Sequence, residues 1–360
     1  MGKGDGRVER SNRGCYRGGI KEKMITFHRI KNAFNILKNE GWVGIKYHWA
    51  LVRDKEKGKR NDCHKVYDIC FIEEGDAERF GKEGVLKPIV FDEHIEPLVS
   101  ILIPVYNQAI YTYYCLQSIK KYTKNIPYEI IIGDDCSTDI SKEMERWIKG
   151  VHIIHHHENY QFLKNCNKIS VEAKGKYIVF LNNDTQVQQG WLEALVGVME
   201  ADKNIGLAGS KLVYPDGLVQ EAGGIVWKDG YVLQYGNGRQ AGEAALNFKR
   251  VVDYISGAAI IVRRELWEKI EGFDERFAPA YYEDVDLAFQ VRERGYQVVY
   301  QPDSEVVHFE GVTERMDDGR MIKIETNRKL FHEKWNKVLE KQHYKKENYT
   351  QLVKRMEKYS

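Results

Sequence analysis

Three short apolar runs, each followed by polar residues, most strongly limit how this chain can fold. They lie at residues 98–105, 128–133 and 177–181 and are rich in β-branched and aromatic side chains. Continuous runs of this kind predict strands that are buried on both faces. Helical patterns separate them at 109–122, 140–149 and 163–173, and a short strand is expected at 151–154. This alternation predicts βαβ units and a largely parallel sheet.

The pattern beyond Leu192 is mixed, so we expect the second half of the domain to be built differently. Strands are predicted at 205–213, 223–227, 258–262 and 296–300, and helices at 285–294 and over most of 322–356. The predicted domain plan is a disordered basic arm at 1–20, a helical extension and linker at 21–97, a main domain at 98–315 and a helical tail at 316–360. The main domain divides into residues 98–190 and 191–315.

The charge of the chain is unevenly distributed, although the net charge of its 360 residues is only +2. Residues 1–65 hold 17 Lys and Arg against 7 Asp and Glu. A basic region can bind nucleic acid or an anionic membrane surface, or can simply be solvated. A helix is predicted over residues 27–37 and ends at Gly41. The aromatic residues that follow at 42–49 could form an interfacial helix on a membrane, or pack on the main domain as an ordinary amphipathic helix. Both interpretations stay open, and no nucleic-acid partner is expected.

Hydropathy and cysteine spacing point to an ordinary globular protein. No apolar stretch has the length of a transmembrane helix, and the N-terminus lacks the apolar core of a signal peptide. The six cysteines form no CxxC pair, which argues against a zinc knuckle or a disulfide framework. A reducing cytoplasm, with contact to the inner face of the membrane left open, is the simplest location.

Two polar clusters follow the first two predicted strands. Their members are Pro104, Tyr106 and Asn107 in the first loop, and Asp134 and Asp135 in the second. Since neighbouring parallel strands end at the same edge of a sheet, the two loops should meet. Their oxygen atoms could then accept hydrogen bonds from a base and a ribose. Alternatively, the acids could cap the helix expected at 140–149, although Ser137 or Asp139 could do so alone.

Asn182, Asn183 and Asp184 directly follow the third strand. A carboxylate at the carboxyl end of a strand suits Mg²⁺ or Mn²⁺, which bind through one or two carboxylates and substrate phosphates. An Asx turn that ends the strand is the alternative. The chain has no Gly-rich phosphate-binding sequence, so a phosphate would depend on a metal. Lys164 could also meet a diphosphate, or could be a surface lysine.

A third group of acids lies at the start of a predicted helix and comprises Glu283, Asp284 and Asp286. The helix macrodipole favours acids at this position. The aromatic and small residues at 272–280 are more typical of a pocket wall, where a carboxylate could act as a general base. His308 ends another strand-like run. It could bind a metal or a diphosphate, or be a hydrogen-bonded core residue.

In this order, the clusters resemble glycosyltransferase family 2, whose domain has the GT-A fold. The resemblance covers residues 98–315. Its motifs are the DDGSTD loop at 133–139, the DxD metal motif at 180–185, the EDxDL motif at 283–287, and acceptor-side segments at 256–259 and 272–275. The chain departs from the family pattern at four positions. Cys136 and Gln161 stand where glycine is usual, Asn182 replaces an Asp, and Gln290 replaces an Arg.

The resemblance implies an α/β fold of the GT-A type, with a mixed, mainly parallel central sheet flanked by helices. It implies an inverting transfer of a sugar from a UDP- or dTDP-sugar donor to a hydroxyl of a glycan or lipid-linked oligosaccharide. The implied cofactor is a divalent cation, Mn²⁺ or Mg²⁺. Residues 220–224 further resemble bacterial surface-glycan enzymes, including rhamnosyltransferases.

The resemblance also implies a role for each candidate residue. Asp284 would be the general base, and Glu283 would orient it or touch an acceptor hydroxyl. Asp184 would bind the ion, with His308 as a further ligand. The residues implied to contact the nucleotide sugar are Pro104, Tyr106, Asn107, Asp134, Asp135, Lys164, Asn182 and Asn183. Those implied to contact the acceptor are Gly257, Ala258 and Tyr282.

Three other functions compete with this interpretation. A nucleotidyltransferase usually carries a Gly-rich, basic loop after the first strand, and residues 104–108 contain neither a glycine nor a basic residue. A non-catalytic protein on a former enzyme fold should have lost Asp184 or Asp284, and both are present. A nucleic-acid binder would rest on the basic residues of 1–65 alone.

Overall fold

The computed structural model describes residues 65–70, 87–311 and 318–343, together with positions 345, 350, 351 and 353. The predicted basic arm at 1–20 lies outside the described residues. So does most of the predicted extension at 21–97, including the helix at 27–37 and the aromatic segment at 42–49. The described residues all belong to the unit His64–Ser360.

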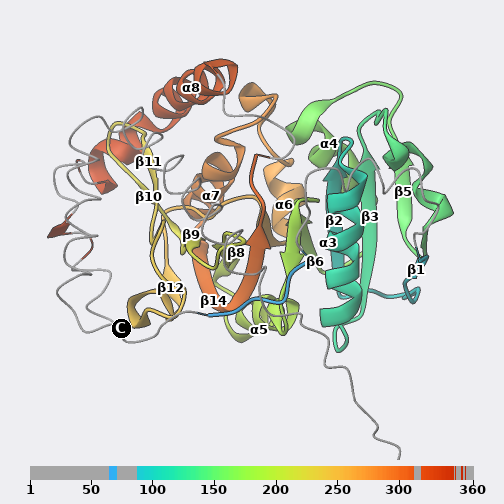
Figure 1. The fold of residues 1–360 in the computed structure, drawn as a ribbon. Coiled ribbons are helices and arrows are strands. Elements are labelled where there is room, and N and C mark those ends of the chain that lie inside the picture. The colour runs from blue at the N-terminus through green and yellow to red at the C-terminus, as the bar shows by residue number, and fades with distance from the viewer. Residues whose placement is uncertain are drawn as a thin grey trace, which may run out of the picture. The chain divides into compact units, whose positions relative to one another are not determined.

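A mixed sheet forms the centre of the described fold (Figure 1). Its strands run in the order β12-β14-β8-β13-β6-β2-β3-β5, with β7 added to β14 and β9 added to β8. The first half is parallel, because β2 pairs with β3 and β6, and β3 pairs with β5. These strands are β2 (Val99–Val105), β3 (Tyr128–Asp134), β5 (His152–His155) and β6 (Tyr177–Leu181). The predicted βαβ units are confirmed.

The second half of the sheet contains the antiparallel pairs. β13 lies between β6 and β8 and is antiparallel to both, while β8 and β14 are parallel. The long strands are β8 (Ile205–Val213), β13 (Ala259–Arg263) and β14 (Gln297–His308). The short ones are β7 (Thr185–Val187), β9 (Val219–Glu221) and β12 (Arg250–Val251). Two separate ribbons pair β1 (Ile89–Val90) with β4 (Ile148–Lys149), and β10 (Gly224–Val226) with β11 (Val232–Gln234).

Helices cover both faces of the sheet. Apolar residues of α3 (Ala109–Tyr122) and α5 (Trp191–Ala201) belong to the core on one face. Those of α4 (Gln161–Ser170), α6 (Arg264–Ile270), α7 (Glu283–Glu293) and α8 (Asp318–Gln342) belong to the core on the other. Short 3₁₀ helices are η1 (Ile140–Arg146), η2 (Ala244–Leu246) and η3 (Glu275–Phe277).

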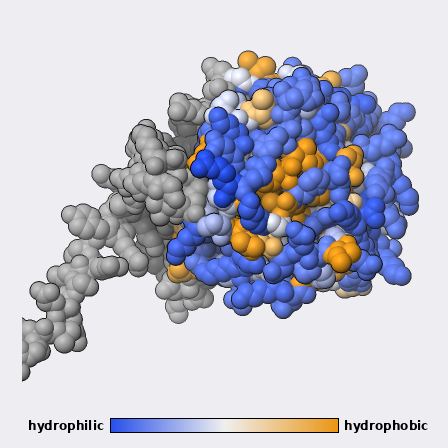
Figure 2. Space-filling view, turned by 90° about the vertical axis from the view of Figure 1, so that its right-hand side faces the viewer, coloured by the Kyte–Doolittle hydropathy of each residue, from blue (hydrophilic) through white to orange (hydrophobic). Residues whose placement is uncertain are grey.

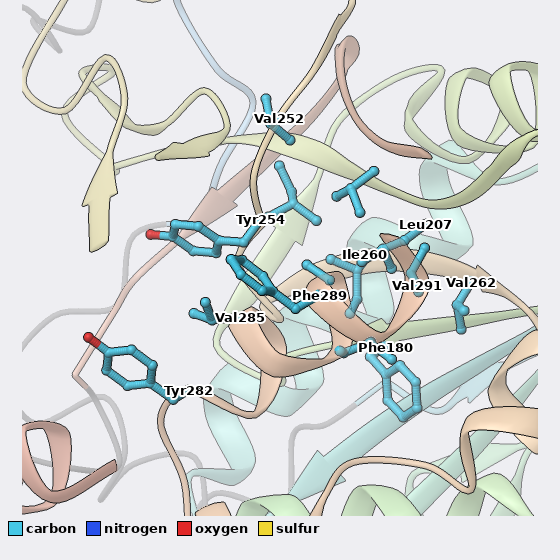
Figure 3. Close-up of a cluster of buried hydrophobic side chains, with 14 of the residues drawn as sticks. Phe180, Leu207, Val252, Tyr254, Ile260, Val262, Tyr282, Val285, Phe289 and Val291 are labelled. Atoms are coloured by element: carbon cyan, nitrogen blue, oxygen red, sulfur yellow. The ribbon is translucent and has the colours of Figure 1, made fainter. Parts of the chain in front are cut away.

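The apolar runs divide between the two cores because alternate residues of a strand face opposite sides of the sheet. On β6, Val179 belongs to one core and Phe180 to the other. Figure 3 shows Val285 and Phe289 of α7 close to Tyr254. The ring of Phe289 also contacts Phe331 and Trp335 of α8, with centroids 4.9 and 5.5 Å apart. Truncating a buried Phe to Ala costs about 3–5 kcal/mol, so Phe289 contributes strongly to holding α7 in the core.

Two predicted elements differ from the structure. The helix expected at 140–149 is the shorter η1, because β4 takes over at Ile148 and pairs with β1 through the bond from Ile89 N to Trp147 O at 2.9 Å. The strand expected at 296–300 extends to His308 across an irregularity between Gln301 and Glu305. A bulge at that point accommodates Pro302, which cannot donate to a ladder.

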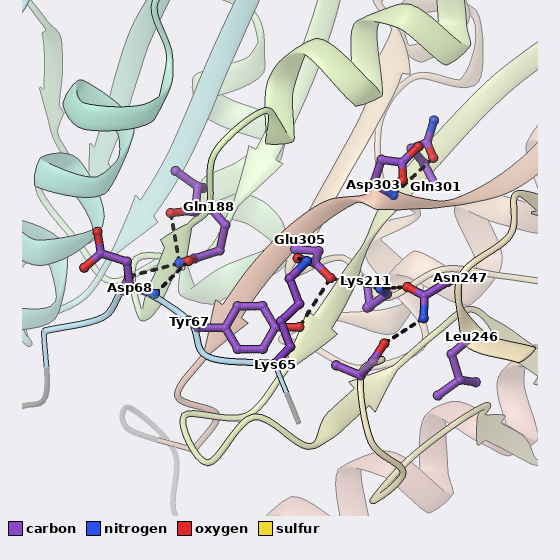
Figure 4. Close-up of polar contacts among 12 residues, drawn as sticks. Lys65, Tyr67, Asp68, Gln188, Lys211, Leu246, Asn247, Gln301, Asp303 and Glu305 are labelled. Atoms are coloured by element: carbon purple, nitrogen blue, oxygen red, sulfur yellow. Dashed lines mark hydrogen bonds and ion pairs between the residues drawn. The ribbon is translucent and has the colours of Figure 1, made fainter. Parts of the chain in front are cut away.

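The segment 65–70 is bound to the sheet by side-chain amides (Figure 4). Gln188 accepts from Asp68 N at 3.0 Å and donates to Asp68 O at 3.1 Å. Gln186 makes the same pair of bonds with Cys70, at 2.8 and 2.9 Å. Each side-chain amide therefore makes the pair of hydrogen bonds that the backbone of a neighbouring strand would otherwise make.

A buried ion pair lies beside this segment (Figure 4). Lys211 is 1% exposed and its ammonium lies 2.9 Å from Glu305 Oε1. Lys65 and the Tyr67 hydroxyl also bond to Glu305. Removing one partner of such a pair leaves a buried charge without compensation.

The face drawn in Figure 2 is largely hydrophilic, with a central hydrophobic area and smaller hydrophobic areas near its edges. In the described part of the chain, no helix combines the length and the apolar character that a bilayer span requires.

Candidate active site

The loops after β2 and β3 meet at one edge of the sheet, as predicted. Val105 and Asp134 are partners in the parallel register. The Asn107 side chain accepts from Thr138 N at 2.7 Å, and Asn107 N donates to Ser137 Oγ at 2.7 Å. These bonds join the two loops directly. The neighbouring residues are Pro104, which is buried, and Tyr106, which is 38% exposed.

Asp134 and Asp135 are both buried, and each binds a different element. Asp134 accepts from Ser137 N at 3.1 Å and lies 2.6 Å from His155 Nδ1. Asp135 accepts from Tyr160 N at 2.7 Å and Gln161 N at 2.6 Å, at the start of α4. Burial raises the pKa of Asp135, although both amide bonds favour its charged form. The alternative prediction was that Asp134 or Asp135 caps the helix that follows. Asp139 caps that helix, η1, by accepting from Ser141 N.

Two positions where the resemblance led us to expect glycine have left-handed backbone. Cys136 has φ 64° and Gln161 has φ 62°. A side chain in this region is crowded by its own backbone, which glycine avoids. The chain therefore keeps the backbone shape of these two turns without the residue that adopts it most easily.

The Asn182–Asp184 triplet forms a turn between β6 and β7. Thr185 Oγ1 donates to Asn182 O at 2.7 Å, and the Asn183 amide donates to Thr112 Oγ1 at 3.0 Å. Asn183 and Asp184 are each 7% exposed. The triplet is thus both a strand-ending turn and a carrier of a buried carboxylate.

His308 lies beside Asp184, which the sequence could only suggest. Antiparallel pairing sets His308 opposite Thr185, and its Nε2 is 3.2 Å from Asp184 Oδ1. Its Nδ1 is 2.9 Å from Gln220 Oε1 on β9. Burial opposes the charged imidazolium, but the Asp184 carboxylate outweighs burial and raises the pKa of His308.

The acids at the start of α7 divide into two kinds. Asp286 is fully buried and accepts from Trp335 Nε1 at 2.7 Å, Lys334 Nζ at 2.9 Å and Gln290 Nε2 at 2.8 Å. It therefore anchors α8. Glu283 is 6% exposed, and its Oε2 makes no hydrogen bond within the described residues. Burial and the adjacent Asp284 raise the pKa of Glu283 well above its ordinary value.

Asp284 is half-buried and faces a tight turn. Its Oδ2 accepts from Gly257 N at 3.0 Å, and its Oδ1 accepts from Val285 N at 2.8 Å. Burial raises the pKa of Asp284 against the opposing effect of these bonds. A Cβ atom at Gly257 would come within 3.4 Å of Asp284 Cβ, so the turn and the carboxylate are closely packed.

Two other predicted residues have their polar groups engaged elsewhere. The Tyr282 side chain is 4% exposed, and its hydroxyl donates to Gly230 O at 2.9 Å (Figure 3). Lys164 Nζ lies 3.5 Å from a Glu275 carboxylate oxygen on η3. Their assignments to acceptor and donor stay predictions.

Sequence reasoning missed Gln220 and Glu221 as individual residues. Adjacent positions of β9, they reach His308 and the amide of Ser256 respectively, the latter bond being 2.8 Å. A polar pair within 220–224 was visible in the sequence, but only long-range pairing shows what each side chain touches.

The fold is of the GT-A type. GalNAc-T7, solved in a crystal structure with UDP, GalNAc and Mn²⁺, superposes with a TM-score of 0.50 over 70% of this chain and 55% of that chain, at 14% identity. Residues 100–270 match the model of Glycosyl transferase family 2, and the chain carries a domain of this family.

Two curated relatives are similar over the same region. The O-antigen biosynthesis protein RfbC of Myxococcus xanthus is 28% identical over 61% of this chain and 18% of that protein. The N-acetylglucosaminyl-diphospho-decaprenol L-rhamnosyltransferase of Mycobacterium tuberculosis is 29% identical over 37% of this chain and 46% of that protein. The chain thus spans less than half the length of these two relatives.

Proposed function

We propose that this chain transfers a sugar from a nucleotide-diphosphate-sugar donor to a hydroxyl of a glycan or lipid-linked oligosaccharide. The proposed donor is a UDP- or dTDP-sugar, and the proposed setting is surface-polysaccharide synthesis. The names of the O-antigen and rhamnosyltransferase relatives support that setting. The observation that carries the proposal is the bond from Asn182 N to Ala258 O at 3.0 Å, which joins the donor-side turn to the turn that binds Asp284.

The joined loops after β2 and β3 are the proposed site for the nucleotide. Asp134 and Asp135 offer carboxylate oxygens to a base or ribose, and the Asn107 amide holds their loop closed. Because Tyr106 is partly exposed beside them, its ring can stack on a base. The UDP bound by the GalNAc-T7 structure is consistent with this assignment.

Asp184 and His308 fit a divalent cation. Both are buried, and their facing atoms are 3.2 Å apart. Gln220 Oε1 fixes His308 Nδ1, which leaves Nε2 directed at Asp184, a usual arrangement for a metal-binding histidine. The described residues hold no group of three His, Cys, Asp or Glu suited to a metal, so phosphate oxygens would complete the shell. The ion would stabilise charge on the leaving diphosphate as a Lewis acid.

Asp284 is the proposed general base. Its carboxylate would take the proton of the acceptor hydroxyl as that oxygen attacks the anomeric carbon, and family membership implies inversion there. The bond from Gly257 N holds one oxygen in place, and burial makes the carboxylate a better proton acceptor. Burial and the neighbouring Asp284 raise the pKa of Glu283 well above its ordinary value, which opposes a second negative charge beside the proposed base.

The experiment is calorimetric titration with a panel of nucleotide sugars, in Mn²⁺ and then in EDTA. The panel contains UDP-glucose, UDP-galactose, their N-acetylated forms, dTDP-rhamnose and GDP-mannose. We expect one metal-dependent binder, whose sugar is then tested for transfer. No binding to any member would reject the proposed donor site and favour a non-catalytic role. A cytoplasmic location and membrane contact stay predictions.

A further inference from the structure

Glu221 is a buried acid that the proposed mechanism leaves unused. It ends β9 and is fully buried. Its Oε1 accepts from Ser256 N at 2.8 Å. Its Oε2 is buried without a hydrogen bond in the described part of the chain, with the Tyr254 phenol as its polar neighbour. Burying a carboxyl oxygen without a hydrogen bond costs free energy, so Glu221 does not hold its place for stability alone.

The turn that Glu221 holds is the one that binds the proposed base. Ser256 N binds Glu221, Gly257 N binds Asp284 at 3.0 Å, and Ala258 O accepts from Asn182 at 3.0 Å. Three consecutive residues thus meet three separate segments of the site. A shift at the first of them would move the other two.

We propose that Glu221 is a positioning residue, whose carboxyl fixes the Ser256–Gly257 turn and thereby orients Asp284. The proposal rests on the proposed function, because it assigns Glu221 to the base of that reaction. Glu221 itself touches no reacting atom. It binds the backbone amide of Ser256, and the amide of the next residue, Gly257, binds Asp284.

The surroundings of Glu221 keep it neutral. Burial is the main cause, and the charge of Asp284 adds to it, so that the pKa of Glu221 rises to about 8. The other titratable groups that face it are Tyr254 and Tyr300, whose own pKa values burial raises well above the ordinary range. A neutral acid can accept from Ser256 N without repelling Asp284, so an amide side chain should do the same.

The test compares Glu221→Gln with Glu221→Ala, using hydrolysis of whichever sugar of the panel binds, with water as acceptor. Misplacing a reacting group by about 1 Å costs about 10²-fold in rate, so we expect a loss of that size in kcat for E221A. The Kd of the nucleotide sugar should be unchanged in both variants. E221Q should keep kcat within about threefold, because its Oε1 still accepts from Ser256 N.

Glu305→Ala is the control, since Glu305 is a buried acid outside the site. It should lower the melting temperature and leave kcat unchanged. If E221A does not fold, Glu221→Asp replaces it, and its shorter side chain should lower kcat about tenfold. An E221A or E221D rate equal to that of E305A would overturn the proposal. So would an E221Q as slow as E221A. Failure of the wild-type protein to bind any panel sugar would instead reject the proposed function.

Discussion

The acids on the donor side of the site are satisfied, whereas those around the proposed base are not. Asp134, Asp135 and Asp184 each lie against at least one hydrogen-bonding or ion-pairing neighbour. Glu221 and Glu283 each keep one buried oxygen without a hydrogen bond among the described residues. Burial without a full set of partners disfavours the charged form of an acid, and it raises the pKa of both Glu221 and Glu283. The proposed donor site and the proposed base therefore lie in two different electrostatic environments.

The largest effect is expected from Asp284→Asn. An amide cannot take the acceptor proton, so kcat should fall by about 10²–10⁴-fold while the Kd of the donor changes little. Donor turnover and calorimetry measure the two quantities. Asp286→Asn on the same helix is the matched control, because that acid binds α8 and should affect stability alone. Near-normal turnover of D284N would remove Asp284 from the base role.

A smaller effect is expected from Asp184→Ala on donor binding. Loss of a charged metal ligand should weaken binding in Mn²⁺ at least about tenfold, or ~1.4 kcal/mol. EDTA should weaken binding by the wild-type protein and have little further effect on the variant. Equal affinities with and without metal in both proteins would mean that Asp184 holds no ion.

Glu221→Gln should change how stability depends on pH. The pKa of Glu221 is 4.5 in the unfolded chain and about 8 in the folded one, so folding takes up a proton between these values. The stability that this group contributes is fully present below about pH 4.5 and is lost as pH rises towards 8. In urea unfolding at several pH values, the free energy of unfolding of E221Q should therefore exceed that of the wild-type protein by an amount that grows with pH. The increase should be up to ~1.4 kcal/mol per pH unit. If the stabilities of the two proteins changed in parallel with pH, folding would not raise the pKa of Glu221.

The smallest effect is expected from Cys136→Gly on the donor side. Glycine relieves the left-handed strain at φ 64°, which should raise the free energy of unfolding by up to about 1 kcal/mol. Cys70→Gly is the control, because the backbone φ of Cys70 is not positive and Cys70 has no such strain to relieve. A loss of stability in C136G would mean that the thiol contributes contacts of its own.

The sequence predicted the parallel half of the fold well, because its strands are local apolar runs. The pairing of the Asn107 and Asp134 loops followed from strand order alone. Sequence motifs identified Asp184 and Asp284, but the residues that these two acids contact could not be predicted from the sequence. The approach of His308 to Asp184 depends on antiparallel pairing of β7 with β14.

The features that sequence reasoning missed all depend on contacts between distant segments. Gln186 and Gln188 look like ordinary polar residues until they bind the segment 65–70. Lys211 interrupts an apolar strand, and only its meeting with Glu305 on β14 explains its burial. Periodicity reports which face a residue occupies, but it cannot report what lies opposite.

The turn at Ser256–Ala258 has a consequence for how the protein reaches its working state. Its partners are 35 and 27 residues away at Glu221 and Asp284, on opposite sides along the chain. Contacts of such separation form only after long loops have closed. No fragment that lacks β9 or α7 can therefore contain the assembled site. Donor turnover is accordingly a stricter measure of complete folding than helix content, because it appears only when the last long-range contacts are made.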